Sequence, residues 1–232
     1  FGGCPNIASL GGGLGHTFTN IMFTQKFVEK TGYTTLEEVI ADKYPIKLIT
    51  KKNGSLGELT AERVIEACGI SVEEFLTFAS WEKTGTDAIK SGIQDDLYDA
   101  TIDHIDAGQA TTTEICLTHD MYFVQLTDET LANMQKMGYA PVVMKAGTWN
   151  GQETDINSMG SQQNVLVSPE MDEDVAYALI KAMCENVDEL ATSVASLKYF
   201  DPQTAGLKEL NGAPLHPGAI RYYQENGLPY DG

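Results

Sequence analysis

The segment GSLGE, residues 54–58, has residue types and a spacing that suit the binding of an anion. It joins a predicted strand to the start of a predicted helix, where backbone N–H groups lack intrahelical partners and the helix dipole is positive. Carboxylates and phosphates bind readily at such helix starts. Ser55 and Glu58 also fit a capping box that only closes the helix end, so both interpretations stay open. The GKS or GKT ending of a phosphate-binding P-loop is missing.

Asp103 and His104 follow the run YDATI, which is a candidate strand. Ligands gather outside the carboxyl ends of strands in open α/β sheets, so His104 is predicted as a ligand contact, with a catalytic base as the alternative. Together with His119-Asp120, these residues could build a metal or acid/base site, but they lack a zincin spacing such as HExxH. His216, which precedes Pro217, is expected to cap a helix or to pack.

A long polar loop contains AGTWNGQ, with Thr148 and Trp149. Loops of more than about 12 residues are often functional. An aromatic side chain beside Gly, Thr and Asn suits the wall or lid of a pocket. The alternative is a surface loop with one packed aromatic side chain.

The sequence offers no catalytic, metal or cofactor motif. GxSxG is absent, and GGGLG at residues 11–15 fails the dinucleotide pattern because His16 stands where its last glycine belongs. The four cysteines, at positions 4, 68, 116 and 184, form no CxxC pair. Cys68 and Cys184 lie in amphipathic helical patterns and are expected to be small buried side chains, although a disulfide stays open. We therefore predict no catalytic residue, no metal site and no cofactor.

Charge narrows the class of partner. The 232 residues include 15 basic and 33 acidic side chains, a formal charge of −18, and the only arginines are Arg63 and Arg221. Nucleic acids and anionic membranes need cationic surfaces, so both are excluded as partners. No apolar stretch approaches the roughly 18–20 residues of a membrane-spanning helix. The chain starts at Phe1, which predicts either a removed leader or a piece of a longer protein.

Strands and helices are expected to position these residues. Strands are predicted at residues 21–28, 46–50, 121–126, 141–144 and 164–167. Helices are predicted from Thr35, at 59–68, from Thr127, from Ser168 and at 216–227, and residues 2–15 read as a loop. The alternation indicates an α/β layered fold, and the length allows one large domain or two small lobes.

Five segments, taken in order, resemble the TAXI class of solute receptors from tripartite ATP-independent periplasmic (TRAP) transporters. They are TGYTTLEEV at 31–39, GSLGELTAERVIEACGI at 54–70, SGIQDDLYDAT at 91–101, AGTWNGQETDI at 146–156 and PLHPGAIRYYQENG at 214–227. The last is the most specific. The resemblance runs from about residue 20 to residue 227.

The resemblance implies a two-lobed fold of the type II periplasmic-binding-protein kind, which closes on a solute held between the lobes. Residues 1–43 and 150–232 would belong to lobe 1, and residues 44–149 would form lobe 2. The N-terminal part of lobe 1 would be missing. Leu56 and Gly57 depart from the family's GSGT, and TIDHID is more polar than the family pattern.

The implied function is an extracytoplasmic receptor, not an enzyme, that delivers a small organic anion or amino acid to a TRAP membrane component. Neither arginine is placed to clamp a carboxylate, so we expect backbone N–H groups at residues 55–57 to hold the anionic group. The hydroxyls of Ser55 and Thr148 would assist, Trp149 would stack, and Asp103 or His104 would contact the other end of the solute. Glu58 completes the predicted contacts. The alternatives are an enzyme on the same fold, or an interaction protein that has lost binding.

Overall fold

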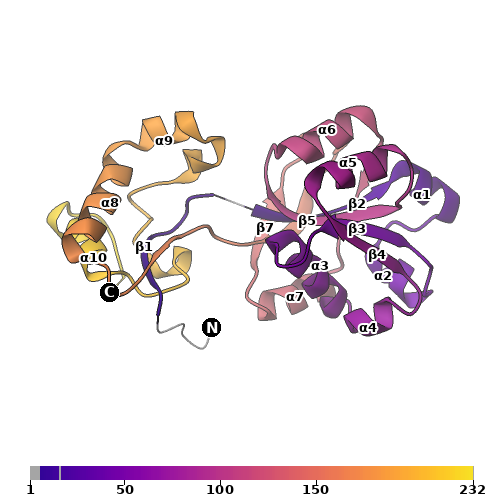
Figure 1. Cartoon of the computed structure of the whole chain (residues 1–232), viewed down its shortest axis with the longest axis horizontal. Helices are drawn as coiled ribbons and strands as arrows, with labels where there is room; N and C mark the ends of the chain where they lie inside the picture. The colour runs from indigo at the N-terminus through magenta and orange to yellow at the C-terminus, as the bar shows by residue number, and fades with distance from the viewer. Residues whose placement is uncertain (1–5, 16, 232) are drawn as a thin grey trace. The chain divides into compact units, whose positions relative to one another are not determined.

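The computed structural model describes residues 6–15 and 17–231, and the chain divides into two compact units (Figure 1). Unit 1 comprises Phe1–Thr17 and Ser161–Gly232, and unit 2 comprises Phe18–Gly160. Both contain helices and strands, which confirms the predicted two-lobed α/β class. Glycine-rich residues 11–15 lie in unit 1, and Cys4 and His16 fall outside the described residues.

Unit 2 is built on a five-stranded mixed sheet with the order β4-β3-β5-β2-β6. The strands are β2 (Thr17–Thr24), β3 (Lys47–Lys51), β4 (Ser80–Thr84), β5 (Ala100–Asp106) and β6 (Met121–Phe123). β3 runs parallel to β4 and to β5, whereas β2 runs antiparallel to β6. The chain thus leaves β3 first toward β4 and later returns to β5 on the other side of β3.

Helices cover both faces of this sheet (Figure 1). In unit 2 they are α1 (Gln25–Thr31), α2 (Leu36–Ala41), α3 (Leu56–Ala67), α4 (Val72–Phe75), α5 (Thr86–Gln94), α6 (Ala110–Thr118) and α7 (Asp128–Lys136). Successive strand residues feed different cores, since Leu48 packs with Val64 of α3 and Ile49 packs with Ile89 of α5. A separate antiparallel ladder joins β7 (Ala140–Met144) to β8 (Ile156–Gly160).

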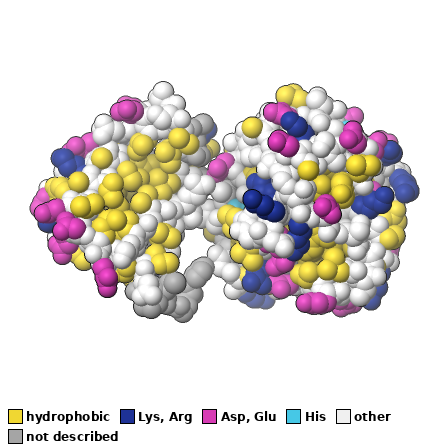
Figure 2. All heavy atoms as spheres, viewed as in Figure 1, with side chains coloured by type: hydrophobic (Ala, Val, Ile, Leu, Met, Phe, Trp, Pro, Cys, Tyr) yellow, Lys and Arg dark blue, Asp and Glu magenta, His cyan; other side chains and the backbone are white. Residues whose placement is uncertain are grey.

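Unit 1 contains a two-stranded antiparallel sheet of β1 (Ala8–Gly11) and β9 (Val165–Val167). Its helices are α8 (Glu173–Glu185), α9 (Val187–Ser193) and α10 (Pro217–Glu225), with 3-10 turns η1 (Ala195–Tyr199) and η2 (Lys208–Leu210). Leu10, Ile180 and Tyr223 are fully buried in its core. Hydrophobic side chains also spread over the visible face of this unit (Figure 2).

The predicted elements are found with three corrections. Residues 25–28 were expected to continue a strand, but Thr24 caps α1 by accepting a hydrogen bond from the N–H of Phe27 at 3.2 Å. The predicted N-terminal loop contains β1, because residues 8–11 pair with β9, and Gly11 leaves room for the Tyr223 hydroxyl, which donates to the carbonyl of Leu10 at 3.0 Å. α8 starts at Glu173 rather than after Ser168, because the carboxylate of Asp172 accepts the first free N–H groups.

The helix ends at Thr35 and His216 are confirmed. Thr35 and Glu38 form the predicted capping box of α2. His216 is buried, and its Nδ1 accepts a hydrogen bond from the N–H of Gly218 at 3.1 Å at the start of α10. His216 is therefore a capping and packing residue, as predicted.

The compact units have other bounds than the predicted lobes. Residues 18–43 and 150–160, expected in lobe 1, belong to unit 2. The reason lies in the sheet, because β2 is an internal strand between β5 and β6, and Phe27 of α1 and Leu36 of α2 pack into the core below it.

Candidate functional site

The carboxyl ends of β3 and β5 form the topological switch point of the unit 2 sheet. The connection that leaves β3 runs to β4 on one side, and the connection that leaves β5 runs to β6 on the other side, so a crevice opens between the ends of β3 and β5. Ligands bind in such crevices in open α/β sheets. Lys51 ends β3, Asp103 is the central residue of β5, and α3 starts from the loop that follows β3.

Lys51 and Asp103 form an ion pair across this crevice. Nζ of Lys51 lies 2.9 Å from Oδ2 of Asp103, and the two side chains are 25% and 14% exposed. The other carboxylate oxygen, Oδ1, accepts the N–H of His104 at 2.8 Å. Burial raises the pKa of the Asp103 carboxyl, and the hydrogen bond and charge of Lys51 offset this only in part. The site therefore holds a cation and an anion that are both costly to leave unpaired.

The first turn of α3 packs against this pair. Ser55 caps the helix, and its Oγ accepts the N–H of Glu58 at 3.2 Å. A Cβ on Gly57 would collide with Oδ1 of Asp103 and would lie 3.3 Å from Cδ of Lys51. Glycine at position 57, where the resembling family has threonine, is thus what admits the Asp103 carboxylate beside the helix start. The N–H groups of Leu56 and Gly57 have no intrahelical acceptor and add positive potential there.

A small enclosed cavity of about 10 Å³ adjoins the ion pair and has room for one water-sized group. Its lining includes Asn20, Lys51, Thr101, Asp103 and Gln109. Asn20 is 1% exposed, and its Oδ1 has no hydrogen-bond partner among the described residues. The cavity therefore presents acceptors, the Asn20 amide oxygen and the Asp103 carboxylate, to a donor placed within it.

His104 lies on the other face of β5 from Asp103, since neighbouring strand residues point to opposite sides. It is 6% exposed, and its ring meets that of Tyr139 edge-on with centroids 5.8 Å apart. Burial, with a smaller contribution from the Lys51 charge, lowers the pKa of His104 to about 4. His104 is thus buried and packed against Tyr139, and its contact with a solute stays a prediction.

Thr148 and Trp149 lie at the opposite edge of the sheet. The last turn of α6 anchors their loop, through a 2.8 Å hydrogen bond from Asn150 to the carbonyl of Cys116. That turn precedes β6, which begins beside the amino end of β5, as the bond from the N–H of Thr24 to the carbonyl of Asp99 shows.

Trp149 is 4% exposed and stacks on Phe123 at 6.1 Å. The hydroxyl of Thr148 donates to the carbonyl of Lys145 at 2.6 Å. Within unit 2 the structure therefore does not bring these two residues together with Ser55 and Asp103. Trp149 is instead a packed core residue.

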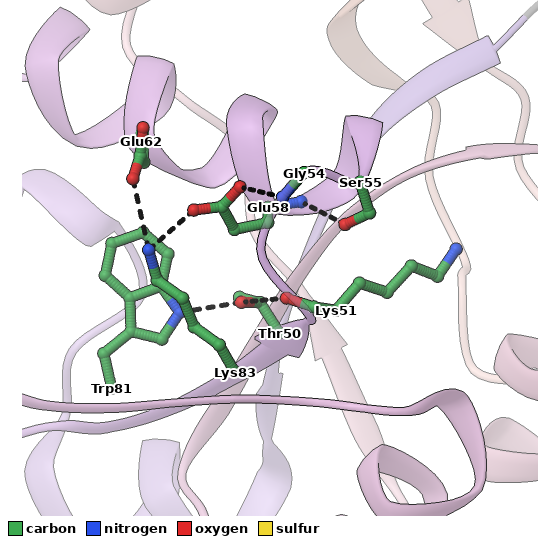
Figure 3. A network of polar contacts seen from close by, with 8 residues as sticks. All are labelled: Thr50, Lys51, Gly54, Ser55, Glu58, Glu62, Trp81 and Lys83. Atoms are coloured by element: carbon green, nitrogen blue, oxygen red, sulfur yellow. Dashed lines mark hydrogen bonds and ion pairs between the residues drawn. The ribbon is translucent and has the colours of Figure 1, made fainter.

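Glu58 also turns away from the crevice. Its carboxylate points toward Lys83 on β4, while the Lys51 side chain extends to the other side (Figure 3). Oε1 of Glu58 lies 2.6 Å from Nζ of Lys83, and Oε2 accepts the N–H of Gly54 at 3.2 Å. Glu58 supports the 52–55 loop rather than facing a solute, which corrects its prediction as a contact.

Two site residues, Lys51 and Asn20, were missed in the sequence. Both arginines are paired on helix surfaces, Arg63 with Glu66 and Arg221 with Asp174, so neither serves the crevice. The available signal was a lysine directly after the predicted strand at 46–50. Nothing in the sequence marks Asn20, because its role depends on β2 lying next to β5.

Within the described ranges, no cluster of three or more His, Cys, Asp or Glu side chains could hold a metal ion. Cys68, Cys116 and Cys184 are free thiols, and burial raises the pKa of Cys68 to about 12. None of the helices in this part of the chain is long and apolar enough to cross a membrane.

Fold and crevice together define an α/β protein of two compact units with a charged site at the switch point of its larger sheet. Residues 32–227 match the model of the NMT1-like family. The chain therefore belongs to the NMT1-like family. No curated protein shows significant similarity to it.

Several solved structures are similar to this chain. A TctC solute-binding protein from Polaromonas is 12% identical over 83% of this chain and 58% of its own, with a TM-score of 0.42. The glycine betaine/L-proline-binding protein ProX from Borrelia burgdorferi is 12% identical over 95% of this chain and 67% of its own, also at 0.42. A glycine betaine/carnitine/choline ABC transporter protein is 9% identical over 95% of this chain at 0.34, and this chain spans only 57% of its length.

Proposed function

We propose that this protein is an extracytoplasmic solute receptor that binds a small organic anion or amino acid for a TRAP-type secondary transporter. Membership of the NMT1-like family and the five TAXI-like segments support the class. The observation that carries the binding site is the ion pair of Lys51 and Asp103, held against the first turn of α3 at the switch point.

Lys51 is the proposed anion contact. Its ammonium and the free N–H groups at the start of α3 favour a carboxylate at the same place. Ser55 fixes that helix start through its cap. This differs from the sequence-based hypothesis, in which backbone N–H groups held the anionic group with the help of the Ser55 and Thr148 hydroxyls.

Asp103 is the proposed contact for a solute amine. A carboxylate that draws Lys51 away leaves Asp103 buried without a counter-charge, which is costly. An amino acid avoids this cost, because its ammonium replaces Lys51 beside Asp103 and the acceptors of the small cavity, including Asn20, can share it. A plain carboxylate needs Asp103 to take up a proton. Amino acids are therefore the favoured solutes.

Transport and location belong to the same proposal. The resemblance to TAXI receptors supports delivery to a TRAP membrane component and a place outside the cytoplasmic membrane. The net charge of −18 is compatible with a protein that recognises its solute through a few local groups rather than through its overall field.

A thermal-shift panel tests the proposal. The protein is unfolded and refolded to strip any bound solute, then heated with amino acids, the matching acids without the amine, dicarboxylates and aromatic acids. A solute at 100 times its Kd should stabilise by about 2.7 kcal/mol, a rise of several degrees. The rise should disappear in Lys51→Met and persist in the exposed control Lys52→Met. A rise that survives Lys51→Met would place binding elsewhere.

A further inference from the structure

Hydrogen bonds and ion pairs connect the 51–55 segment and the start of α3, which carry the proposed anion contacts, to the edge strand β4. Lys83 and Trp81 are two residues apart on this strand and extend toward α3 and β3 (Figure 3). Thr50 pairs in register with Lys83 in the parallel ladder of β3 and β4. Neither Lys83 nor Trp81 lines the cavity beside Lys51.

One arm of this network runs through the ammonium of Lys83. Its Nζ lies 2.6 Å from Glu58 and 3.1 Å from Glu62, one turn apart on α3. Glu58 is only 7% exposed, and its second oxygen accepts the N–H of Gly54. Gly54 has a φ of +82°, so this bond holds a left-handed turn just before the Ser55 cap.

The other arm runs through the indole of Trp81. Its Nε1 donates to Oγ1 of Thr50 at 2.7 Å, and the Thr50 hydroxyl donates to the carbonyl of Lys51 at 3.2 Å. The Lys83 ammonium also lies 4.3 Å from the centroid of the Trp81 ring, which couples the two arms. Together they fix both ends of the segment between Lys51 and Ser55.

Charge makes the Lys83 arm strong. The hydrogen bond from Lys83 holds the pKa of Glu58 below its ordinary value, although burial acts in the opposite sense. Burial also opposes the charge of Lys83, but the hydrogen bonds to Glu58 and Glu62 raise the pKa of Lys83. Both groups are charged near neutral pH, and charge-assisted hydrogen bonds are about twice as strong as neutral ones.

We propose that Lys83 and Trp81 are positioning residues for solute binding, which hold the 51–55 segment and the start of α3 in the geometry that Lys51 and the α3 N–H groups need. This inference rests on the proposed function, because the held segment is the proposed anion site. Sites whose supporting contacts are lost become loose and lose affinity without losing a direct contact. Lys83 and Trp81 touch no solute in this account.

Hydrogen exchange of the solute-free protein tests the positioning by itself. In Lys83→Met, the hydrogen-bonded amides of Gly54, Ser55 and Glu58 should exchange about tenfold faster, while those of β5 keep their rate. Lys83→Arg, which keeps the charge, should restore protection. Lys90→Met, which breaks an exposed ion pair to Glu114 on another helix, is the matched control and should change nothing in residues 53–58. Trp81→Phe removes the indole donor while keeping an aromatic ring, and serves as a second variant should Lys83→Met fail to fold.

Affinity then tests the link to binding. L-alanine, L-glutamate and L-phenylalanine are titrated as probes, one for each class of side chain. For the probe that binds the unaltered protein, Kd should rise roughly tenfold in Lys83→Met and return in Lys83→Arg. Unchanged exchange in both Lys83→Met and Trp81→Phe, or faster exchange with unchanged Kd, overturns the proposal. If none of the probes binds the unaltered protein, the proposed function fails for amino acids, whereas the exchange result still decides whether β4 holds the segment.

Discussion

At the scale of single residues, the proposed binding depends on a solute that replaces the contact between Lys51 and Asp103. Lys51 and Asp103 neutralise each other at 2.9 Å in a place where neither is fully solvated. A solute that pairs with Lys51 must also supply a positive charge for Asp103. An amino acid carries both the carboxylate and the ammonium group that this requires. We therefore expect the ion pair to select for amino acids, since a solute with only one of the two charges leaves a buried partner uncompensated.

Removing one member of the pair should destabilise the protein more than removing both. Lys51→Met leaves Asp103 charged and largely buried, and we expect a loss of about 1–3 kcal/mol in the free energy of unfolding. Adding Asp103→Asn should restore part of this loss. Urea denaturation measures both, and Lys52→Met should stay within about 0.5 kcal/mol of the unaltered protein. A double variant less stable than Lys51→Met would refute the assigned charge balance.

His104 predicts a pH dependence of stability. Its pKa of about 4 in the folded protein lies below its ordinary value, so the folded protein binds fewer protons than the unfolded chain between about pH 4 and 6.5. Stability should therefore fall as the pH drops through this window, by up to about 3 kcal/mol from this residue. The loss should be smaller in His104→Gln, measured by urea denaturation at pH 6.5 and 4.5. Equal losses in both proteins would contradict the neutral, buried state of His104.

At the scale of elements, the start of α3 must lie close to the middle of β5, where the Asp103 carboxylate contacts the first turn of the helix. Gly57 allows this approach, because any side chain there meets Oδ1 of Asp103. The Ser55 cap and the two arms from β4 then fix the direction of the helix. The geometry of the site thus depends on strands β3, β4 and β5 as well as on the GSLGE motif.

Gly57→Ala should disrupt this approach. The added methyl group displaces the Asp103 carboxylate, and overpacking of this kind costs about 1–3 kcal/mol. Solute-induced stabilisation should fall with it. Gly85→Ala is the matched control. Gly85 is the N-cap of α5, and nothing lies within 4 Å of its added Cβ. Equal melting temperatures and equal solute shifts in the two variants would refute the close contact.

Local patterns in the sequence predicted the elements well where side chains cap helix ends. Ser55, Thr35 and Thr127 cap α3, α2 and α7 as their spacing indicates. The residues of the candidate site were harder to predict, because they come together only through the order in which the strands pair in the sheet. Asp103 and His104 are neighbours in sequence, yet alternation sends them to opposite faces of β5.

Long-range pairing explains the errors over Trp149 and Lys51. The loop of Trp149 lies at the amino edge because β6 begins beside Asp99, a fact fixed by the sheet and not by the loop. Lys51 was missed because the sequence-based prediction considered only the two arginines as carboxylate clamps. Its value emerges only once β5 brings Asp103 within 2.9 Å of it.

At the scale of the whole molecule, every residue assigned to the site belongs to unit 2. Its sheet has helices on both faces and its own buried core, whereas unit 1 has a two-stranded sheet and its own separate core. The predicted lobe bounds and the missing part of lobe 1 remain predictions about the receptor as a whole. The site itself depends on unit 2 for its geometry.

Unit 2 should therefore fold when produced alone. A fragment of residues 18–160 keeps all five strands apart from Thr17, and a chain of this length buries enough surface for a stable core. We expect one cooperative thermal transition and retained protection of the α3 start in hydrogen exchange. A fragment without a cooperative transition would contradict the independence of unit 2.

The most direct measurement compares an amino acid with the same acid lacking its amine. Calorimetric titrations of the refolded protein with L-alanine, L-glutamate and L-phenylalanine, each against its deaminated counterpart, report the contribution of the ammonium group. We expect the amino acid to bind at least about tenfold more tightly at pH 7 than the same acid without its amine. In Lys51→Met, neither the amino acid nor its deaminated counterpart should bind. Equal affinity for the two members of that pair, or binding that survives Lys51→Met, would contradict the Lys51–Asp103 site.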